Sequence, residues 1–358
     1  MEIIANTCIK HKLWRFYAQK KERNLEKKEM GFVIAVHRDR FEVEVLGKIL
    51  YAKLKTGVYY NMKQEIKFPT VGDEVDIIIN PLGDSLIVGT KERKTRFLRD
   101  NPTPGMGEQT IAANFDYVFI MMSLNHNFNL NRMERYLTLA WQSGAIPVVI
   151  LTKVDITEDA NEKIQLAKES AVGVDIYAIS SITGYGMEQL NKYFEIGKII
   201  VFLGSSGVGK STFANTLLGE EVMETADIRE GDSEGHHTTT HRQIIKLPSG
   251  AMIIDTPGMR ELGMWEADQG VLQAFEDIEN IILKCKFNNC SHKTELGCAI
   301  KISLQNGTLS EKRWKNYIML KKESERTKHK ETFFLKQKRK QISVKRGSRR
   351  NKKLDYPF

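Results

Sequence analysis

The amino-acid sequence predicts a multidomain protein: a small β-barrel, then an α/β domain with a parallel sheet, then a mostly α-helical C-terminal domain. Short runs rich in β-branched and aromatic residues fill the segment from Gly31 to about Gly89. Near-continuous apolar runs then alternate with helical patterns between Tyr117 and Ile254, which is typical of a parallel sheet covered on both faces. Beyond about Trp265 the pattern is helical. We expect the domains at residues 1–95, 96–264 and 265–358.

The barrel is predicted from five short strands separated by turn signals. The strands are Phe32–Val36, Phe41–Leu46, Ile49–Leu54, Glu74–Ile79 and Ser85–Val88. Five strands within about sixty residues favour an OB-like barrel, and a small SH3-like barrel is the alternative. Residues 1 to about 30 are basic and polar, and form an arm or an added helix ahead of the barrel.

The α/β domain is predicted from five apolar strands, which follow a basic linker at Lys91–Arg99. The strands are Tyr117–Leu124, Ile146–Leu151, Val174–Ile179, Ile199–Leu203 and Ala251–Ile254. The expected helices cover about Leu130–Trp141, Asp159–Ala171, Met187–Phe194 and Lys210–Leu217.

A phosphate-binding loop lies between the fourth of these strands and the helix that follows. It has the pattern G-x-x-x-x-G-K-S in Gly204-Ser205-Ser206-Gly207-Val208-Gly209-Lys210-Ser211. The glycines allow backbone N–H groups to converge on phosphates, and the helix N-terminus adds positive charge. Lys210 is expected to bridge the β- and γ-phosphates and Ser211 to ligate Mg²⁺, with Thr212 next to them in the site.

A second phosphate motif follows about forty-five residues later, at the end of an apolar strand. Asp255-Thr256-Pro257-Gly258 offers a carboxylate that can hold Mg²⁺ through water. Gly258 can donate its N–H to the γ-phosphate. Between the two motifs, the polar segment Gly231–Arg242 includes Thr238, Thr239 and Thr240, any one of which can complete the Mg²⁺ shell.

Two segments predict recognition of guanine. Thr152-Lys153-Val154-Asp155 follows a strand and matches N-K-x-D except at Thr152. Asp155 would accept hydrogen bonds from guanine N1–H and N2–H₂, which adenine cannot supply. The stem of Lys153 can cover the base, and the hydroxyl of Thr152 predicts weaker base binding than a carboxamide. Ser180-Ser181, after another strand, fits the last guanine loop.

The guanine motifs therefore precede the phosphate motifs, which is the reverse of the usual order in GTPases. The same sheet can still form, because strand adjacency does not depend on where the chain begins. The sequence thus predicts a circularly permuted P-loop domain, in which the segment after Asp255 leads directly into the C-terminal domain.

A metal site is predicted in the C-terminal domain. Three cysteines and one histidine lie within fourteen residues: Cys285, Cys290, His292 and Cys298. Three thiolates and an imidazole form the closed, tetrahedral set of a structural zinc site. Cys8 lies far from this cluster, and no C-x-x-C pair is present for redox chemistry.

Charge and hydropathy restrict the partners. The net charge is +9, and from Lys321 to the C-terminus there are fifteen Lys and Arg against four Asp and Glu, which favours a polyanion such as nucleic acid as the partner. No stretch approaches the roughly eighteen apolar residues of a membrane helix, and Lys10, His11 and Lys12 interrupt any signal-peptide core. A cytoplasmic protein without a membrane partner is expected.

The motifs together resemble the RsgA (YjeQ) family of circularly permuted GTPases. The resemblance rests on residues 152–155, 204–211, 235–242, 255–261 and the cluster at 285–298, and it covers roughly residues 31 to 325. Thr152 and the long basic ends depart from the family pattern. The resemblance implies a monomer that hydrolyses GTP to GDP slowly with Mg²⁺, carries one structural zinc, and assists late maturation of the small ribosomal subunit by binding rRNA.

The water-positioning residue is the least determined part of the site. Met259 follows Asp255–Gly258 where many GTPases have a glutamine, and it cannot orient a water molecule. His236, His237 and His241 lie on the loop before Arg242, and His237 matches the histidine that the resemblance implies is catalytic. Two other functions use the same motifs: a GTP-gated factor acting on another RNA, and a non-catalytic GTP-binding scaffold.

Overall fold

The computed structural model describes residues 28–59, 68–100, 108–221, 223, 242–255, 262 and 267–327. Contacts divide the chain into two compact units, with the division between Glu92 and Arg93. The predicted N-terminal arm, the basic C-terminal tail and most of Gly231–Arg242 lie outside the described residues.

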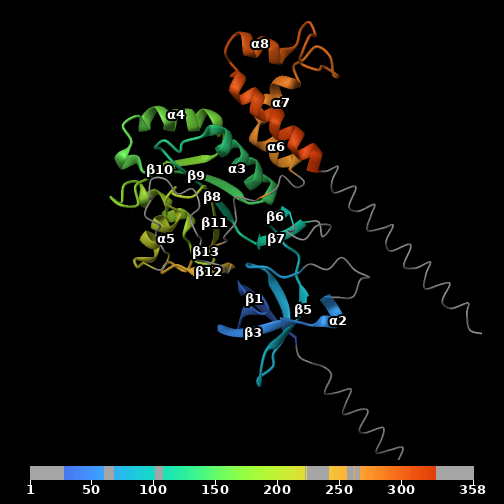
Figure 1. Cartoon of the computed structure of the whole chain (residues 1–358), viewed down its shortest axis with the longest axis vertical. Helices are drawn as coiled ribbons and strands as arrows, with labels where there is room; N and C mark the ends of the chain where they lie inside the picture. Colours follow the sequence, from blue (N-terminus) through green and yellow to red (C-terminus); the bar gives the residue numbers. More distant parts are fainter. Residues whose placement is uncertain are drawn as a thin grey trace, which may run out of the picture. The chain divides into compact units, whose positions relative to one another are not determined.

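The first unit is a closed barrel of five strands, drawn in blue shades in Figure 1. They are β1 (Lys28–Val36), β2 (Phe41–Val45), β3 (Lys48–Leu54), β4 (Glu74–Ile78) and β5 (Ser85–Thr90). The pairing order is β1-β2-β3-β5-β4, and β4 pairs again with β1, so the sheet closes on itself. The parallel β3–β5 pair and the closure give the OB-like barrel that the sequence predicted.

The barrel is filled by the inward-facing residues of alternating strands. Val33, Val43, Val75, Ile77 and Ile87 are fully buried in one apolar cluster. Gly31 is needed where β1 crosses this cluster, because a Cβ there would lie 2.4 Å from a methyl carbon of Val43. The short helix α2 (Thr56–Tyr59) lies beside β5, and Tyr59 donates to or accepts from Thr90 at 2.9 Å.

The second unit contains the predicted α/β sheet. Its strands are β8 (Tyr117–Ser123), β9 (Ile146–Thr152), β10 (Asp175–Ala178), β11 (Ile199–Leu203), β12 (Arg242–Lys246) and β13 (Met252–Asp255). Their order is β10-β9-β8-β11-β13-β12, and every pair is parallel except β13–β12, which is antiparallel. Strand β11, which follows the guanine segments in sequence, therefore inserts between β8 and β13, as the permuted motif order requires.

Helices cover both faces of this sheet (Figure 1). On one side lie α3 (Leu130–Ser143) and α4 (Ala160–Ser170), and on the other lies α5 (Lys210–Leu218). Phe213 and Ala214 of α5 pack in an apolar cluster with Phe119, Met121 and other strand residues. The predicted helix at Met187–Phe194 is instead a 3₁₀ helix, Met187–Tyr193.

A hairpin precedes the sheet, and the sequence analysis did not expect it. Its strands are β6 (Arg96–Asp100) and β7 (Glu108–Ala113), so the second half of the predicted basic linker is a strand. Phe97 is buried and stacks on Phe115 at 4.7 Å between ring centroids. Phe97 and Leu98 are both buried between the partly exposed Arg96 and Arg99, so this segment belongs to a half-buried hairpin rather than a solvated connection.

The C-terminal part of the described chain is helical. It comprises α6 (Asp268–Ala274), α7 (Glu276–Ile282), α8 (Ala299–Gln305) and a helix over residues 311–327.

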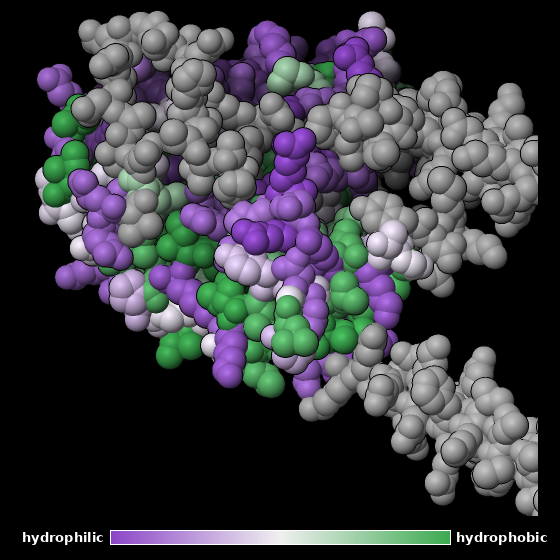
Figure 2. Space-filling model, turned by 60° about the horizontal axis from the view of Figure 1, so that its bottom comes forward, coloured by the Kyte–Doolittle hydropathy of each residue, from purple (hydrophilic) through white to green (hydrophobic). Residues whose placement is uncertain are grey.

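In Figure 2, which turns the bottom of Figure 1 forward, hydrophobic and hydrophilic side chains are intermixed on the face that is seen. Among the described residues, no helix has the length and apolar character that crossing a membrane requires.

Candidate functional site

The phosphate loop lies between β11 and α5, as predicted. Gly204 is buried, and a Cβ there would lie 2.7 Å from the carbonyl oxygen of Met121, so only glycine allows β8 to pass this closely. Gly207 and Gly209 have φ values of 73° and 96°, the left-handed region that glycine adopts without strain. Val208 is fully buried and anchors the loop in the core below it.

The lysine of this loop folds back and contacts the start of the loop. Lys210 Nζ donates to the carbonyl oxygens of Gly204 and Ser205 at 2.9 and 2.7 Å. Ser211 and Thr212 occupy the first turn of α5, and Ser206 and Gly207 are exposed at the mouth of the loop. The loop therefore leads directly into the N-terminus of α5, whose partial positive charge favours an anion such as phosphate.

The predicted guanine segment joins this loop directly. Thr152 is the last residue of β9 and is 3% exposed, and its hydroxyl donates to the carbonyl oxygen of Val208 at 2.6 Å. Lys153 has a φ of 64°, which turns the chain so that Val154 and Asp155 form a short 3₁₀ turn. Asp155 is exposed, so its carboxylate is available to a ligand.

The second predicted guanine loop packs against the first predicted segment. Val154 N–H donates to the carbonyl oxygen of Ile179 at 3.3 Å, immediately before the buried Ser180. The loop is closed by the Ser180 hydroxyl, which accepts from Thr183 N–H, and by the Ser181 carbonyl, which accepts from Thr216 of α5. Lys153, Ser180 and the phosphate loop are thus gathered at the carboxyl edge of β9, β10 and β11.

Asp255 is the last residue of β13, next to β11, and lies opposite Gln243 of β12. Parallel strands bring Asp255 to the same sheet edge as the phosphate loop. Gly258, His236, His237, His241 and Thr238–Thr240 lie outside the described residues, so their predicted roles stay predictions.

Two residues of the site were missed by the sequence analysis. Asn127, in the loop between β8 and α3, donates from Nδ2 to the Ser205 hydroxyl at 3.1 Å. Arg132, on the first turn of α3, donates from Nη2 to Asn127 Oδ1 at 2.7 Å and also to the Asn127 backbone carbonyl. The signal was the asparagine-rich run Asn125–Asn129 at the end of a predicted strand, next to the strand that carries the phosphate loop.

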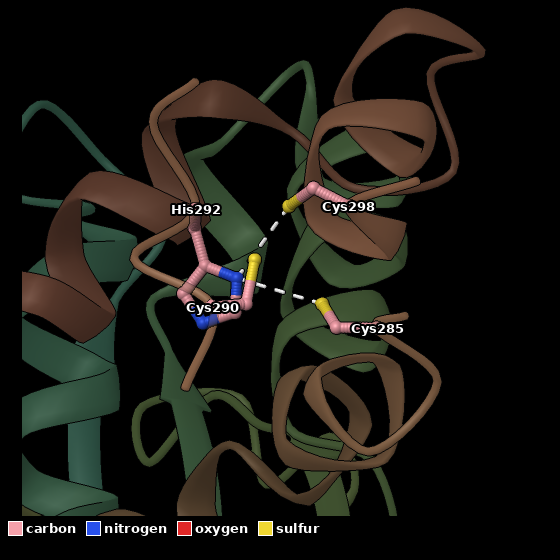
Figure 3. Close-up of side chains that lie close together, drawn as sticks. All are labelled: Cys285, Cys290, His292 and Cys298. Carbon is pink, nitrogen blue, oxygen red and sulfur yellow. Dashed lines mark hydrogen bonds between the residues drawn. The ribbon is translucent and has the colours of Figure 1, made fainter. Parts of the chain in front are cut away.

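The predicted metal ligands come together in the C-terminal domain (Figure 3). Ligand atoms of Cys285, Cys290, His292 and Cys298 all lie within 4.8 Å of one another. His292 Nδ1 lies 3.6 and 3.5 Å from the sulfur atoms of Cys285 and Cys298. A tetrahedral zinc ion with sulfur and nitrogen ligands separates them by about 3.3 to 3.8 Å, so these two distances fit zinc.

Local backbone geometry and burial suit these residues to metal binding. His292 and Gly297 have φ values of 61° and 78°, which produce the tight turns around the cluster. Cys285 follows α7, and Cys298 caps α8 and is 2% exposed. Burial lowers the pKa of His292, so its imidazole is neutral at neutral pH and can act as a ligand.

Known proteins match both the sequence and this architecture. Residues 90–265 match the family model for the RsgA GTPase. The chain is 45% identical over 293 residues to the small ribosomal subunit biogenesis GTPase RsgA 2 of Listeria monocytogenes serotype 4b (strain F2365), covering 82% of this chain and 83% of that protein. Another relative, from Methanosarcina acetivorans, is 38% identical over 81% of this chain and 78% of its own length and has the name small ribosomal subunit biogenesis GTPase RsgA.

Solved structures agree with the fold. The chain superposes on YjeQ from Thermotoga maritima with a TM-score of 0.61 and 26% identity, covering 82% of this chain and 98% of that one. The resemblance first drawn from the motifs and their permuted order is therefore confirmed, as are the OB-like barrel and the permuted α/β domain. The chain belongs to the RsgA GTPase family.

Proposed function

We propose that this protein binds GTP with Mg²⁺, hydrolyses it slowly to GDP and phosphate, and acts in maturation of the small ribosomal subunit by binding its rRNA. The single observation that carries the GTP proposal is the hydrogen bond from Thr152 to the carbonyl of Val208. It joins the predicted guanine-reading segment to the predicted phosphate loop, although 56 positions separate them in the sequence. The ribosomal part rests on the names of the relatives.

The proposed phosphate site consists of Gly204–Ser211 and Thr212. Lys210 would exchange its loop carbonyls for the β- and γ-phosphate oxygens, and Ser211 would ligate Mg²⁺. Asp255 at the end of β13 would hold the same ion through water, with Gly258 donating to the γ-phosphate. The ion would neutralise charge on the phosphates. The chain would position the phosphates and donate hydrogen bonds to them from its backbone.

The proposed guanine site consists of Thr152–Asp155 with Ser180 and Ser181. Asp155 is exposed and free to accept from the guanine N1–H and N2–H₂ groups. Lys153 would lie along the base. We propose that His237 orients or activates the attacking water, because a histidine can serve in any of these roles and Met259 cannot.

Zinc is proposed at Cys285, Cys290, His292 and Cys298, where it would hold the loop between α7 and α8 in a fixed shape. The proposed domains are 1–95, 96–264 and 265–358. The OB-like barrel, the zinc-binding domain and the basic ends would contact RNA. We further propose that the protein is cytoplasmic and monomeric.

The test measures GTP hydrolysis and co-sedimentation with separated ribosomal subunits. Hydrolysis should be slow alone and faster with the small subunit, while Lys210→Ala should abolish it in both conditions. Binding should favour the GTP-analogue state and weaken with salt, because Lys and Arg contacts release counterions from RNA. Stimulation by a different RNA alone would point to another RNA substrate, and GTP binding without any hydrolysis would point to a scaffold.

A further inference from the structure

Helix α3 is linked to the phosphate loop through Asn127, in the loop that precedes the helix. Asn127 Nδ2 donates to the Ser205 hydroxyl at 3.1 Å, and the carboxamide oxygen of Asn127 accepts from Arg132 Nη2 at 2.7 Å. Asn129 caps the helix by accepting from Arg132 N–H at 3.0 Å. Arg132 Nε is buried with no hydrogen-bond partner in the described part of the chain.

The next residues of α3 are bound by the C-terminal domain. Glu134 is 3% exposed, and its carboxylate accepts from Arg313 Nη1 at 2.7 Å, from Asn316, and from the Ser170 hydroxyl at 2.5 Å. Arg313 in turn pairs with Asp277 at the start of α7. A buried carboxylate needs such partners, so the docked helix over residues 311–327 is required to satisfy Glu134.

A second ion pair extends the same contact. Arg135 donates to both carboxylate oxygens of Glu323 at 2.5 and 2.8 Å. On α6, a Cβ at Gly270 would lie 2.2 Å from the carbonyl oxygen of Thr138, so the two helices touch backbone to backbone. Helix α3 is therefore fastened to the C-terminal domain at Glu134, Arg135 and Thr138, over a little more than one helical turn.

The metal-binding cluster contacts the helix over residues 311–327. Trp314 follows Arg313, and its ring meets the ring of His292 edge-on at 5.6 Å and stacks on Tyr317 at 5.4 Å. Adjacent residues of one helix thus contact a predicted zinc ligand and the buried carboxylate of α3. A chain of contacts runs from the metal-binding cluster through Trp314, Arg313, Glu134 and α3 to the phosphate loop.

We propose that α3 couples the phosphate loop to the zinc-binding domain, so that docking of this domain on Glu134 and Arg135 tightens nucleotide binding at Ser205. This inference rests on the proposed function. Because binding free energies are reciprocal, nucleotide at the phosphate loop must tighten the docking of the C-terminal domain by the same factor. Arg135 Nη2 also donates to the carbonyl oxygen of Leu262 at 3.5 Å, so the segment after Asp255 contacts the same helix.

A charge exchange between α3 and the C-terminal helix tests the proposal. Arg135 and Glu323 are partly exposed, at 31% and 38% of their side chains, so reversing one charge does not bury an isolated charge. We expect Arg135→Glu and Glu323→Arg each to speed dissociation of a fluorescent GDP analogue from the zinc-loaded full chain about fivefold or more, and the double exchange to restore the wild-type rate within about twofold.

The matched control is Glu311→Arg on the same helix. Glu311 pairs with Lys315 at 2.8 Å, and both side chains are about three-quarters exposed, at 75% and 74%. This variant should dissociate GDP at the wild-type rate with the same zinc content. Wild-type rates in both single variants, or a double exchange as fast as either single variant, would overturn the coupling.

A second arm needs no nucleotide, so it separates the coupling from the proposed function. Asn127→Ala removes the link to Ser205, and Asn161→Ala on the exposed face of α4 is its control. We expect amide hydrogen exchange in residues 311–327 to rise about fivefold in Asn127→Ala and to stay unchanged in Asn161→Ala. Equal exchange in both variants overturns the coupling. If the wild-type chain fails to bind guanine nucleotide while this arm succeeds, the proposed function fails and the coupling stands.

Discussion

The hydroxyl of Thr152 donates a 2.6 Å hydrogen bond to the carbonyl oxygen of Val208, and both residues are buried. Thr152 stands where N-K-x-D motifs have asparagine, and its side chain is directed to the phosphate loop. The substitution therefore keeps the connection between the base-reading and phosphate-reading segments.

Thr152→Val should weaken GDP binding about tenfold, because it leaves the buried carbonyl of Val208 without its donor. Thr152→Ser keeps the hydroxyl and should bind within about twofold of wild type. Titration of a fluorescent GDP analogue measures both. Weakened binding in Thr152→Ser together with wild-type binding in Thr152→Val would show that the methyl group, and not the hydrogen bond, matters.

Asp155→Asn should lower affinity for guanine nucleotides and favour xanthine nucleotides, because the carboxamide offers a donor where guanine also has one. Asp155 is exposed, so the folding transition should not change. Competition between GTP, ATP and XTP for the same site gives the measurement. Similar affinities of the wild-type chain for ATP and GTP would contradict the assignment of Asp155 as the base reader.

Metal analysis should give one zinc per chain, and Cys290→Ser or removal of zinc by a chelator should loosen the C-terminal domain first, because such sites couple metal binding to folding. Trp314 lies against His292, so its fluorescence should change as the metal leaves. Cys8→Ser, a cysteine outside the cluster, is the control and should keep its zinc. A fully folded wild-type protein without zinc would refute the site.

Arg313→Met should destabilise the protein by about 3 to 5 kcal/mol, because it leaves Glu134 buried without its counter-charge. Burial acts to lower the pKa of Arg313, but Asp277 and then Glu134 outweigh it and raise that pKa, so the guanidinium stays charged. Adding Glu134→Leu should recover much of the loss, since the unpaired charge is then removed. Chemical denaturation of the full chain, followed by circular dichroism, distinguishes a buried charge pair from a packing contact that the double variant cannot repair.

Much of this protein could be predicted from its sequence through local chemistry. Gly207 and Gly209 predict left-handed backbone, the spacing of Cys285 to Cys298 predicts one metal ion, and apolar runs predict buried strands. Each of these signals involves neighbours in the chain, so the motifs, the five barrel strands and the permuted order of the sheet were all predicted.

Contacts between distant segments were decided only by the tertiary structure. The pair Glu134–Arg313 joins residues 179 positions apart, and neither residue differs in its local pattern from a solvated helix residue. For the same reason, the sequence did not predict that Asn127 and Arg132 lie beside the phosphate loop, or that the basic linker contains strand β6. Whether a charged side chain is solvated or buried depends on whether the fold brings a partner to it, because burying a charge is costly without one. That partner can lie far away in the sequence, so the local sequence does not predict it.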